Sequence, residues 1–592
     1  MAISREKHIE FYNWQIQEFE EEWERYARSP VRILIQEKRL FVGRIWGIQE
    51  RQGNVILRFK AGSVPRMKQP YLLCMVGSVV PDKTNEWNFT YIEFRTSLSP
   101  RLSGKDTEVY TKYYLKSDND NWSYIAVSGF ELELITAVNE NSLSKGIHPL
   151  IVIAETDPPV EYLLNLRKFV EQNNNDPVLK LSSKIDEATW NPINLDNERD
   201  ILTDVLKEID YNKKMVIQGP PGTGKSFLVA RIISQFLNQN KAVVATALTN
   251  RALIEIADKE GLEEAISKGS VFKTNLSGDE SKKLPGLKSV ISFSPVNGEL
   301  LLTTYYKFSQ KYWELQAGSK RFDLLVIEEA SQAFLASIAM FCSIAKSVLI
   351  IGDHRQLNPI VINQQDAWKI DLGINSIIYG LKTYTFSQDD ISFRLTKTRR
   401  LTTESSKLTG LYYDNTLKSI SELNGKVSIE STFIRLFHKN GGITIARMPS
   451  SGIGFSKSNI IRIMCIIASD LMVRNEKLEV ALLSPYIKVE SLLYDYYSRL
   501  SSDYSRITIS TIHKIQGLTT DITILFLPLD NAGFDLDDNL FNVATSRAKM
   551  GTLIITYNHI NLVSSATQET RTFIHSCDDV SESFKALLKD TK

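Results

Sequence analysis

A glycine-rich segment has the residue types and spacing to hold phosphate. The pattern GxxxxGK[ST] is matched by Gly219-Pro-Pro-Gly-Thr-Gly-Lys225-Ser226, between the apolar run Met215 to Gln218 and the helical run Phe227 to Leu237. A phosphate-binding loop requires this strand–loop–helix context, in which glycines let backbone N–H groups approach phosphate oxygens. We predict that Lys225 neutralises the β- and γ-phosphates of a nucleoside triphosphate and that Ser226 binds Mg²⁺. The predicted nucleotide-binding residues of the loop are Gly219, Pro220, Pro221, Gly222, Thr223, Gly224, Lys225 and Ser226.

Two adjacent carboxylates, Glu328 and Glu329, follow the apolar run Leu324 to Ile327. Mg²⁺ prefers hard oxygen ligands and usually keeps waters, so Glu328 can hold the ion through a water while Glu329 polarises the attacking water. Adjacent acids after a strand are, by themselves, more typical of a solvated helix start. The phosphate loop in the same chain favours the catalytic interpretation. Ser226 and Glu328 are therefore the predicted metal ligands.

Three further segments match the motifs of a known family in the right order. They are Val348-Leu-Ile-Ile-Gly352-Asp353-His-Arg-Gln356-Leu-Asn-Pro359, Thr511-Ile-His-Lys-Ile-Gln516-Gly517 and Asn542-Val-Ala-Thr-Ser-Arg547-Ala-Lys549. These segments resemble motifs III, V and VI of the superfamily 1 helicases, and the two sites above resemble motifs I and II. The stretches Glu-Ala-Ser-Gln, Asp-His-Arg-Gln-Leu and Val-Ala-Thr-Ser-Arg are most similar to the branch of the nonsense-mediated-decay helicase, which belongs to group B and moves 5′ to 3′. The resemblance spans roughly residues 195 to 560.

The resemblance implies a catalytic set at a cleft between two domains. Gln356 would sense the γ-phosphate, and Arg400 and Arg547 would reach the phosphates from the second domain as arginine fingers. Hydrolysis would then depend on closure of the cleft. The predicted catalytic residues are Lys225, Glu328, Glu329, Gln356, Arg400 and Arg547.

The resemblance also implies contacts with the nucleotide base and with a nucleic-acid strand. Arg199, Arg399 and Gly517 are the remaining predicted nucleotide-binding residues, although the family has an adenine-reading glutamine at position 199 and an aromatic ring at position 399. Glu328 replaces the usual aspartate of motif II, and Thr519 the usual glutamate of motif V. Arginine offers only donors, so we expect weak discrimination between ATP and other triphosphates. The predicted contacts with single-stranded DNA or RNA are Thr249, Asn250, Thr303, Thr304, Pro485, Tyr486, Thr511 and His513.

The regions around these motifs alternate short apolar strands with helices, which is typical of parallel sheets covered on both faces. The expected strands are 215–218, 242–247, 300–304, 324–327 and 348–351 in a first series and 480–483, 507–510, 522–526 and 553–556 in a second. We predict an α/β fold with two tandem RecA-like domains over 191–365 and 366–592, called 1A and 2A in the family. Surface loops are expected at 273–285, 438–442 and 449–457.

The N-terminal part shows a different pattern. A narrow apolar stripe on an expected helix that ends at Ser29-Pro30 consists of Ile9, Tyr12, Ile16, Phe19, Trp23 and Tyr26. A second amphipathic helix is expected after Pro158-Pro159, so the two helices are predicted to pair as a stalk over 1–30 and 158–190, the latter including a linker. β-rich stretches at 31–35, 40–45 and 55–59 predict a small β-barrel over 31–157. The related helicase branch carries such a barrel, called 1B.

Composition limits the other possibilities. The net charge of +1 excludes a uniformly basic nucleic-acid coat but leaves room for a local basic groove. The four cysteines lie far apart without a CxxC pair, so a zinc or iron–sulfur module is not indicated. The longest apolar runs fall short of the roughly 18 residues that a membrane span needs. We therefore predict a cytoplasmic protein that does not contact membranes.

Two functions stay open at this point. The favoured hypothesis is a helicase or translocase on single-stranded nucleic acid, with ATP and Mg²⁺ as cofactors. The alternative is a nucleotide-gated clamp or signalling ATPase with slow turnover, which Glu328 and the changed base-reading positions favour. A helicase–nuclease fusion would need a cluster of metal-binding carboxylates or histidines outside the two α/β domains, and the sequence shows none. A separately encoded nuclease or another protein is a candidate partner. Genome maintenance, RNA surveillance and mobile-element defence all fit.

Overall fold

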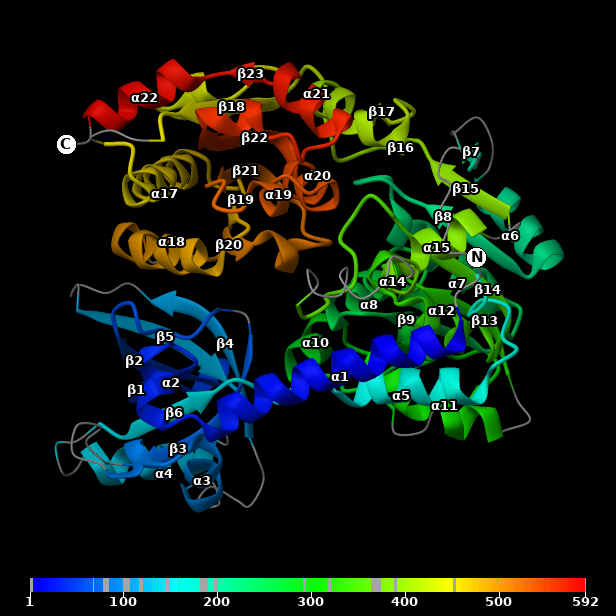
Figure 1. The fold of residues 1–592 in the computed structure, drawn as a ribbon, viewed down its shortest axis with the longest axis horizontal. Coiled ribbons are helices and arrows are strands. Elements are labelled where there is room, and N and C mark those ends of the chain that lie inside the picture. Colours follow the sequence, from blue (N-terminus) through cyan, green and yellow to red (C-terminus); the bar gives the residue numbers. More distant parts are fainter. Residues whose placement is uncertain are drawn as a thin grey trace.

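A closed barrel and two parallel sheets organise the chain in the computed structural model (Figure 1). The structure describes residues 4–590 except 68, 78–84, 99–106, 116–120, 131, 144–145, 147, 159, 182–189, 196–200, 291–293, 318–320, 364–373, 388–390, 451–453 and 502. The first unit comprises the parallel sheet and helices of residues 193–395, and the second unit comprises those of residues 396–590. The barrel lies below the second unit in Figure 1, and the first unit lies to the right of both.

A parallel sheet forms the centre of the first unit. Its strands are β7 (Ile193–Leu195), β8 (Lys214–Gln218), β9 (Val243–Ala247), β10 (Val271–Lys273), β11 (Lys288–Ser289), β12 (Leu300–Thr304), β13 (Phe322–Ile327), β14 (Ala345–Gly352) and β15 (Ile391–Leu395). Over the described residues these nine strands are ordered β11-β10-β12-β9-β13-β14-β8-β15-β7. Every residue of β9 and β12 is buried, as expected for strands covered on both faces. The five strands predicted for this region are confirmed.

The helices of the first unit cover its sheet. They are α6 (Ile201–Asn212), α7 (Lys225–Asn238), α8 (Asn250–Ala257), α9 (Glu263–Ser267), α10 (Gly278–Lys283), α11 (Tyr305–Ala317), α12 (Leu335–Cys342), α14 (Ile374–Ile378) and α15 (Gly380–Ser387). Two separate apolar cores, one on each side of the sheet, contain alternate residues of the central strands: Val244 and Leu325 lie in one core, and Val243 and Leu324 in the other. The fold of the unit thus follows from strands that are apolar on both faces.

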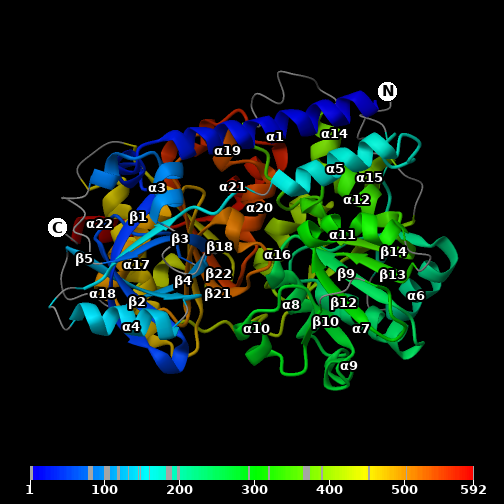
Figure 2. The ribbon, with the colours of Figure 1, turned by 90° about the horizontal axis from the view of Figure 1, so that it is seen from below.

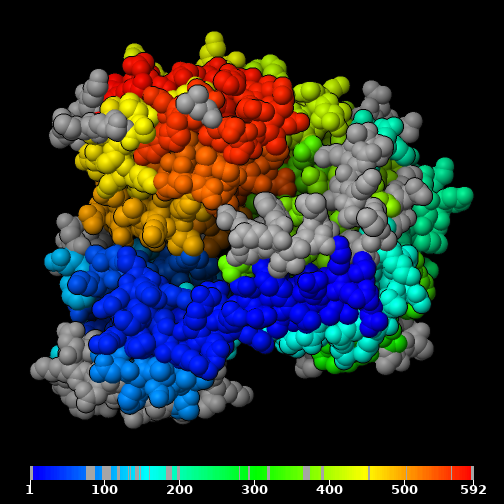
Figure 3. All heavy atoms as spheres, in the orientation of Figure 1, coloured from blue at the N-terminus to red at the C-terminus, as the bar shows by residue number. Residues whose placement is uncertain are grey.

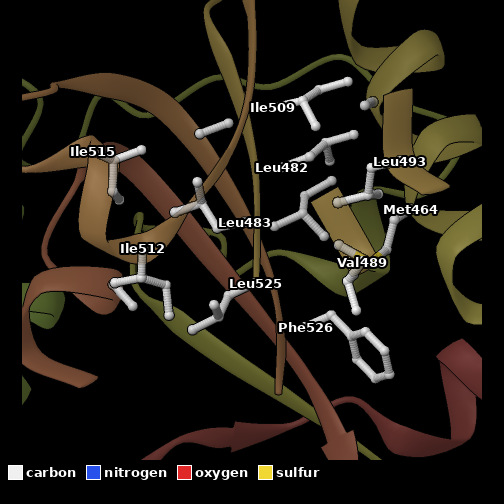
Figure 4. Close-up of a cluster of buried hydrophobic side chains, with 14 of the residues drawn as sticks. Met464, Leu482, Leu483, Val489, Leu493, Ile509, Ile512, Ile515, Leu525 and Phe526 are labelled. Carbon is white, nitrogen blue, oxygen red and sulfur yellow. The ribbon is translucent and has the colours of Figure 1, made fainter. Parts of the chain in front are cut away.

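The second unit repeats this plan with a smaller sheet. Its strands are β18 (Ile443–Met448), β19 (Val480–Ser484), β20 (Ile507–Thr511), β21 (Thr520–Leu527), β22 (Ala548–Tyr557) and β23 (Asp578–Asp579), in the order β20-β19-β21-β22-β18-β23. Its helices are α16 (Thr403–Gly410), α17 (Lys457–Arg474), α18 (Ile487–Leu500), α19 (Ala532–Asp535), α20 (Asp538–Thr545), α21 (Gln568–Ser576) and α22 (Ser581–Asp590). A short parallel pair, β16 (Lys397–Thr398) and β17 (Lys418–Ser419), flanks α16 in the chain. In Figure 4, Leu482 and Ile509 of the sheet lie near Leu493 of α18 in the core. The four predicted strands are present.

The N-terminal barrel closes in the strand order β1-β2-β5-β4-β3-β6. These strands are β1 (Leu40–Gln49), β2 (Asn54–Lys60), β3 (Pro70–Gly77), β4 (Thr107–Leu115), β5 (Trp122–Ser128) and β6 (Leu150–Ala154), and α2 (Val31–Gln36), α3 (Tyr91–Leu98) and α4 (Leu132–Leu143) flank them. Antiparallel pairing joins all neighbours. A Cβ at Gly43 would lie 2.7 Å from the Phe59 ring, so only glycine lets this ring fill the barrel there.

Helix α1 (Arg5–Arg28) joins the barrel to the first unit. Its N-terminal half packs with α5 (Val160–Gln172), where Arg167 donates to Asn13 at 2.9 Å, and its Phe11 ring lies 5.8 Å from Phe334 of the first unit. Its C-terminal half packs on the barrel side through Tyr26, whose ring lies 4.7 Å from that of Tyr91. Figures 1 and 2 both show α1 extending from one body to the other. The predicted apolar stripe is thus divided between two partners.

The barrel also contacts the second unit. Tyr114 of β4 stacks on Tyr494 of α18, with ring centroids 5.0 Å apart, and also on Tyr504 at 5.9 Å. The space-filling view shows the barrel in blue directly below the second unit in orange (Figure 3). A cavity of about 1270 Å³ lies along this seam, between residues such as Arg66 and Tyr71 of the barrel and Leu492 of α18. The barrel therefore contacts the second unit directly and is joined to the first unit through α1.

Two predicted local structures are corrected. The β-branched stretch 31–35 was expected to be a strand, but it forms the helix α2, with Val31 and Leu34 buried on one face. Packing of these two side chains against the core around Tyr91 outweighs the preference of valine and isoleucine for strands. The expected loop 273–285 contains α10, which begins with a capping box of Ser277 and Glu280.

The predicted boundary between the α/β domains at residue 365 is also corrected. Strand β15 lies beyond that residue and pairs with β8, with Phe393 opposite Ile217. The chain therefore returns to the first sheet before it enters the second unit. The edge position beside β8 is available because β14 occupies only the other side of β8.

Candidate active site

A cavity of about 560 Å³ lies between the two units. Residues that follow β8, β13 and β14 line it from the first unit, and residues after β16, after β20 and at the start of β22 line it from the second. The cavity is therefore built at strand ends, where parallel sheets present polar loops. The predicted residues that line it are Pro221, Gly222, Thr223, Gly224, Lys225, Ser226, Glu328, Glu329, Gln356, Arg399, Arg400, Gly517 and Arg547. Gly219 and Pro220 belong to the same loop.

The glycines of the loop after β8 are required by its geometry. A Cβ at Gly219 would lie 2.1 Å from Cγ of Lys225, because the Lys225 side chain folds back and its Nζ donates to the carbonyl of Gly219. Gly224 has φ of 85° and precedes α7, so a left-handed residue sets the start of the helix. The resulting turn leaves backbone N–H groups and the helix start facing the cavity, which suits an anion.

Two carboxylates at the end of β13 face this loop. Burial raises the pKa of Glu328, and burial together with the nearby charge of Glu255 raises the pKa of Glu329 to about 7. Within the described residues Glu328 Oε2 is buried and has no hydrogen-bond partner, while the Ser226 hydroxyl lies close enough to the carboxylate to lower its pKa. An unpartnered carboxylate oxygen beside a hydroxyl fits a divalent cation with oxygen ligands.

Two arginines approach the loop from the second unit. Arg547 is buried, and its Nε donates to the carbonyl of Val543 at 2.8 Å, which fixes the side chain on α20. Nη1 of Arg400 donates to the carbonyl of Ser546 at 3.2 Å, so the two guanidinium groups are held by adjacent backbone. Burial lowers the pKa of Arg400 to about 10 and, with the charge of Arg400, that of Arg547 to about 9. Both groups remain positive at neutral pH and face the anion site.

The chain after β15 holds the phosphate loop directly. The backbone N–H of Arg399 donates to the carbonyl of Gly222 at 2.9 Å, and the Thr398 hydroxyl donates to that of Pro221 at 2.9 Å. The predicted base-side residue Arg199 lies outside the described residues. Arg399 and Gly517 line the cavity as expected, and Thr519 does too.

Three functional residues were missed by the sequence interpretation. Glu255 of α8 lines the cavity, and its Oε1 accepts from the Ser226 hydroxyl at 3.4 Å. Tyr413 and Asn542 connect the units: the Tyr413 hydroxyl donates to Asp353 Oδ2 at 2.7 Å, and Asn542 Nδ2 donates to the Tyr413 oxygen at 2.8 Å. Asn542 stood inside a quoted motif without a role, whereas nothing in the local pattern marked Glu255 or Tyr413.

The predicted nucleic-acid contacts lie at the ends of β9, β12, β19 and β20, outside the cavity lining. Thr249 caps α8 and its hydroxyl donates to Glu329 Oε2 at 3.4 Å, and the Asn250 side-chain oxygen accepts from Lys273 at 2.9 Å. His513 is exposed and its ring stacks on Phe534 at 5.8 Å, with Tyr486 at 6.1 Å from the same ring. These positions, which lie at strand ends of both units, are together called the row below.

Four of the predicted contacts are buried, which differs from the expectation. Thr303 is fully buried and its hydroxyl accepts from Thr274 at 3.2 Å, while Thr304, Thr511 and Pro485 are also buried. Their side chains are therefore not accessible to nucleic acid in this conformation. The exposed groups of the row are Thr249, Asn250 and His513, and Tyr486 is partly exposed.

Two further observations concern membrane-spanning helices and cysteines among the described residues. No helix among them is long and apolar enough to cross a bilayer. All four cysteines are buried free thiols.

Comparisons with known proteins agree with the site. The model of a family described as an AAA domain matches residues 203–364. Over 251 residues the chain is 28% identical to the DNA replication ATP-dependent helicase/nuclease DNA2 of Saccharomyces cerevisiae, which covers 41% of this chain and 16% of that protein. It is 25% identical over 397 residues to the ATP-dependent helicase NAM7 of the same yeast, covering 57% of this chain and 39% of that protein. It is 23% identical over 401 residues to the ATP-dependent helicase upf1 of Schizosaccharomyces pombe, covering 57% and 42%.

The chain spans less than half the length of each of these relatives. Among solved structures, it matches the arterivirus nonstructural protein 10 (helicase) in complex with DNA at 14% identity, covering 60% of this chain and 62% of that one, with a TM-score of 0.34. The two parallel sheets fit tandem RecA-like domains. Motif order, the cavity between two units and the helicase relatives together confirm that the chain is similar to the superfamily 1 helicases and, within them, resembles the nonsense-mediated-decay branch.

Proposed function

We propose that the chain is an ATP-dependent helicase or translocase on single-stranded nucleic acid that hydrolyses nucleoside triphosphate between its two RecA-like units. One observation carries the proposal: the same cavity is lined by Lys225, Glu328, Glu329 and Gln356 of the first unit and by Arg400 and Arg547 of the second. A site made by two bodies is sensitive to their relative position. Hydrolysis can therefore be linked to movement along a strand.

The proposed roles are those that the residue types and the family resemblance imply, and the places of the residues in the cavity support them. The phosphate loop and Lys225 bind the β- and γ-phosphates, and Gln356 contacts the γ-phosphate from the end of β14. Ser226 and Glu328 would hold Mg²⁺, which would supply charge neutralisation at the phosphates. Glu329 orients the attacking water and accepts its proton. Arg400 and Arg547 stabilise the charge that develops on the transferred phosphoryl group.

The remaining parts of the chain are assigned as follows. We take α1 and α5 as the stalk and the closed barrel as the 1B domain of the related branch. The first RecA-like domain then extends to residue 395, and the second follows it. Single-stranded DNA or RNA lies across the row that includes Thr249, Asn250, Tyr486 and His513. The names of the relatives, which include a helicase/nuclease and ATP-dependent helicases, support movement on nucleic acid.

The experiment is a nucleotide-hydrolysis assay of the full chain with and without single-stranded DNA and RNA. Stimulation by either strand supports the motor. The alternative is a nucleotide-gated clamp with slow turnover. Glu328 favours it, because glutamate is one methylene longer than the usual aspartate and would place a metal-binding carboxylate at a different position. Tight strand binding that depends on nucleotide, without strand-stimulated turnover or unwinding, would support the clamp.

A further inference from the structure

The outer face of the barrel carries a stack of aromatic and cationic side chains. Trp46 of β1 is 41% exposed and Trp122 of β5 is 36% exposed, and the Arg58 guanidinium of β2 lies between them, 4.2 Å from one ring centroid and 4.4 Å from the other. The His148 ring also stacks on Trp46, with centroids 4.3 Å apart and an interplanar angle of 23°. We call His148, Trp46, Arg58 and Trp122 the outer ladder.

The described strands of the outer ladder, β1, β2 and β5, carry positive charge and no carboxylate. Arg44 stands directly opposite Arg58 in the antiparallel pair β1–β2, and Lys60 is opposite Trp122 in the pair β2–β5. Like charges at opposite positions of two strands destabilise a sheet. The three strands contain no aspartate or glutamate, and within the described residues Arg58 makes no ion pair or hydrogen bond. Burial and the charge of Arg58 lower the pKa of Arg44. This face is therefore complementary to an anion.

The barrel does not need the outer ladder to close. Its interior is filled by the opposite faces of the same strands, where Ile45, Leu57 and Ile125 are fully buried. The ladder is also separate from the contacts that fix the barrel, since β4 meets the second unit through Tyr114. Both ribbon views place β1, β2 and β5 on the side of the barrel away from the first unit (Figures 1 and 2). Two exposed indoles, beside an arginine that makes no ion pair with the described residues, favour the binding of a ligand.

We infer that the outer ladder is a second binding site for single-stranded nucleic acid, outside the cleft between the units. Phosphates accept from the guanidinium groups of Arg44 and Arg58 and from Lys60, and bases pack against the exposed indoles and extend the stack at its ends. An acidic peptide would need only the cations for binding. This face alternates cations with planar rings, which together can bind the phosphates and the bases of single-stranded nucleic acid. The inference rests on the proposed function, because the nucleic acid bound by the outer ladder is the same single strand on which the proposed helicase acts.

The test compares strands of two lengths on the full chain by fluorescence anisotropy, with a non-hydrolysable ATP analogue. A labelled strand of about 8 nucleotides fills the track across the two units, and one of about 30 nucleotides can also reach the barrel. Arg58→Gln is expected to lower the affinity for the long strand about tenfold, to leave that for the short strand unchanged, and to leave hydrolysis without nucleic acid unchanged. The control is Arg499→Gln, which changes an exposed arginine that also lies over a ring, 5.6 Å from the centroid of Tyr496. It should change neither affinity.

The other outcomes are distinct. Equal affinity of Arg58→Gln and the unaltered chain for the long strand overturns the inference, as does an equal loss for both strands, which would place the effect in the track. Trp122→Tyr keeps a ring at the end of the ladder and should lower long-strand affinity less than Trp122→Ser. Displacement of the long strand by poly-glutamate with the same potency as by unlabelled strand would instead indicate a protein partner and overturn the inference. If the unaltered chain binds neither strand, the proposed function itself fails.

Discussion

The Tyr413 hydroxyl donates a hydrogen bond to Asp353 Oδ2 at 2.7 Å, and this bond joins the two units. Asp353 follows β14 of the first unit, whereas Tyr413 belongs to the core of the second. The same Asp353 oxygen accepts from Gln356 Nε2 at 2.9 Å, and the Tyr413 oxygen accepts from Asn542 Nδ2 at 2.8 Å. A buried chain of hydrogen bonds thus links Gln356 to α20, the helix that precedes Arg547.

Tyr413→Phe is predicted to uncouple hydrolysis from strand binding. The substitution keeps the ring and removes the hydroxyl, which leaves the buried Asp353 oxygen and Asn542 amide with one partner fewer and costs roughly 1–3 kcal/mol of stability. We expect the stimulation of hydrolysis by a single strand to fall about tenfold, because Gln356 and Arg547 no longer move together, with little change in nucleotide affinity. Steady-state hydrolysis at saturating strand, with nucleotide binding measured separately, checks this.

The neighbouring tyrosine provides the control. The Tyr412 hydroxyl makes a hydrogen bond of 2.6 Å with Thr570 within the second unit, so Tyr412→Phe perturbs one unit without touching the link. Similar stimulation in Tyr413→Phe and the unaltered chain, or an equal loss in both variants, would contradict a specific role for Tyr413.

The second prediction tests the catalytic assignment. Lys225→Ala and Glu329→Gln should each lower hydrolysis by at least about 10²-fold, since one removes phosphate neutralisation and the other the proton acceptor for the attacking water. Glu329→Gln keeps the phosphate loop, so it should still bind nucleotide and hold a strand. The control is Glu260→Gln, which removes the same charge at an exposed position past the end of α8. Turnover close to that of the unaltered chain in either catalytic variant would refute the site.

Local patterns predicted the parts of the molecule that are determined locally. The phosphate loop, β8 and the apolar strands β9, β12 and β13 are visible because their conformation is set by neighbouring residues. Strand β15 was missed because its apolar residues gain a sheet position only when they meet β8, which lies far away in sequence. The same reason applies to Tyr413: its ring is an ordinary apolar residue until folding brings its hydroxyl to Asp353.

Burial also explains why the sequence could not predict which of the proposed nucleic-acid contacts are exposed. Thr303 and Thr304 have the polar side chains expected at a strand end, yet both are covered in the fold. Side-chain type gives the chemistry that is available, but exposure depends on how the elements around β12 pack. Arg58 was overlooked for the converse reason, since its stacking on two tryptophans comes from pairing between β2 and β5 and from the bulge in β1.

A third prediction concerns the dependence of stability on pH. His8 of α1 is buried, its Nε2 lies 3.1 Å from the carbonyl of Leu179, and burial lowers its pKa to about 4. The unfolded chain therefore takes up a proton at about pH 6.5, well before the folded chain does. The contribution of neutral His8 is complete above about pH 6.5 and is lost as the pH falls towards 4, by up to about 3 kcal/mol.

The measurement is the midpoint of thermal unfolding at several pH values. His8→Gln keeps a polar side chain at the position without a group that titrates in this range. Its midpoint should decrease less than that of the unaltered chain between pH 6.5 and pH 4.5. The exposed His559 provides a control, because His559→Gln should follow the unaltered chain. Parallel curves for His8→Gln and the unaltered chain would show that His8 does not determine the acid sensitivity.

The fourth prediction is the direction of movement. The resemblance to the nonsense-mediated-decay branch leads us to expect 5′-to-3′ movement on one strand. Forked duplexes with a single tail at either the 5′ or the 3′ end decide it, with labelled strands separated on a gel. Unwinding of the 5′-tailed substrate is expected. Unwinding of the 3′-tailed substrate alone would place the chain in a different branch, while the arrangement of the cavity would stand.

The last prediction concerns the base of the nucleotide. Arginine stands at positions 199 and 399, and Arg399 lines the cavity between the units. A glutamine presents a donor and an acceptor together to the edge of adenine, whereas arginine offers donors only, so paired reading of adenine is lost. The planar guanidinium of Arg399 can still stack on any base, which gives affinity with little discrimination. We therefore expect GTP to be hydrolysed at a rate comparable to that of ATP, with similar KM values. Competition of each triphosphate against labelled ATP measures the preference. A preference above about 100-fold, equivalent to roughly 2.7 kcal/mol, would require an adenine-reading contact elsewhere in the cavity and would contradict the role given to these arginines.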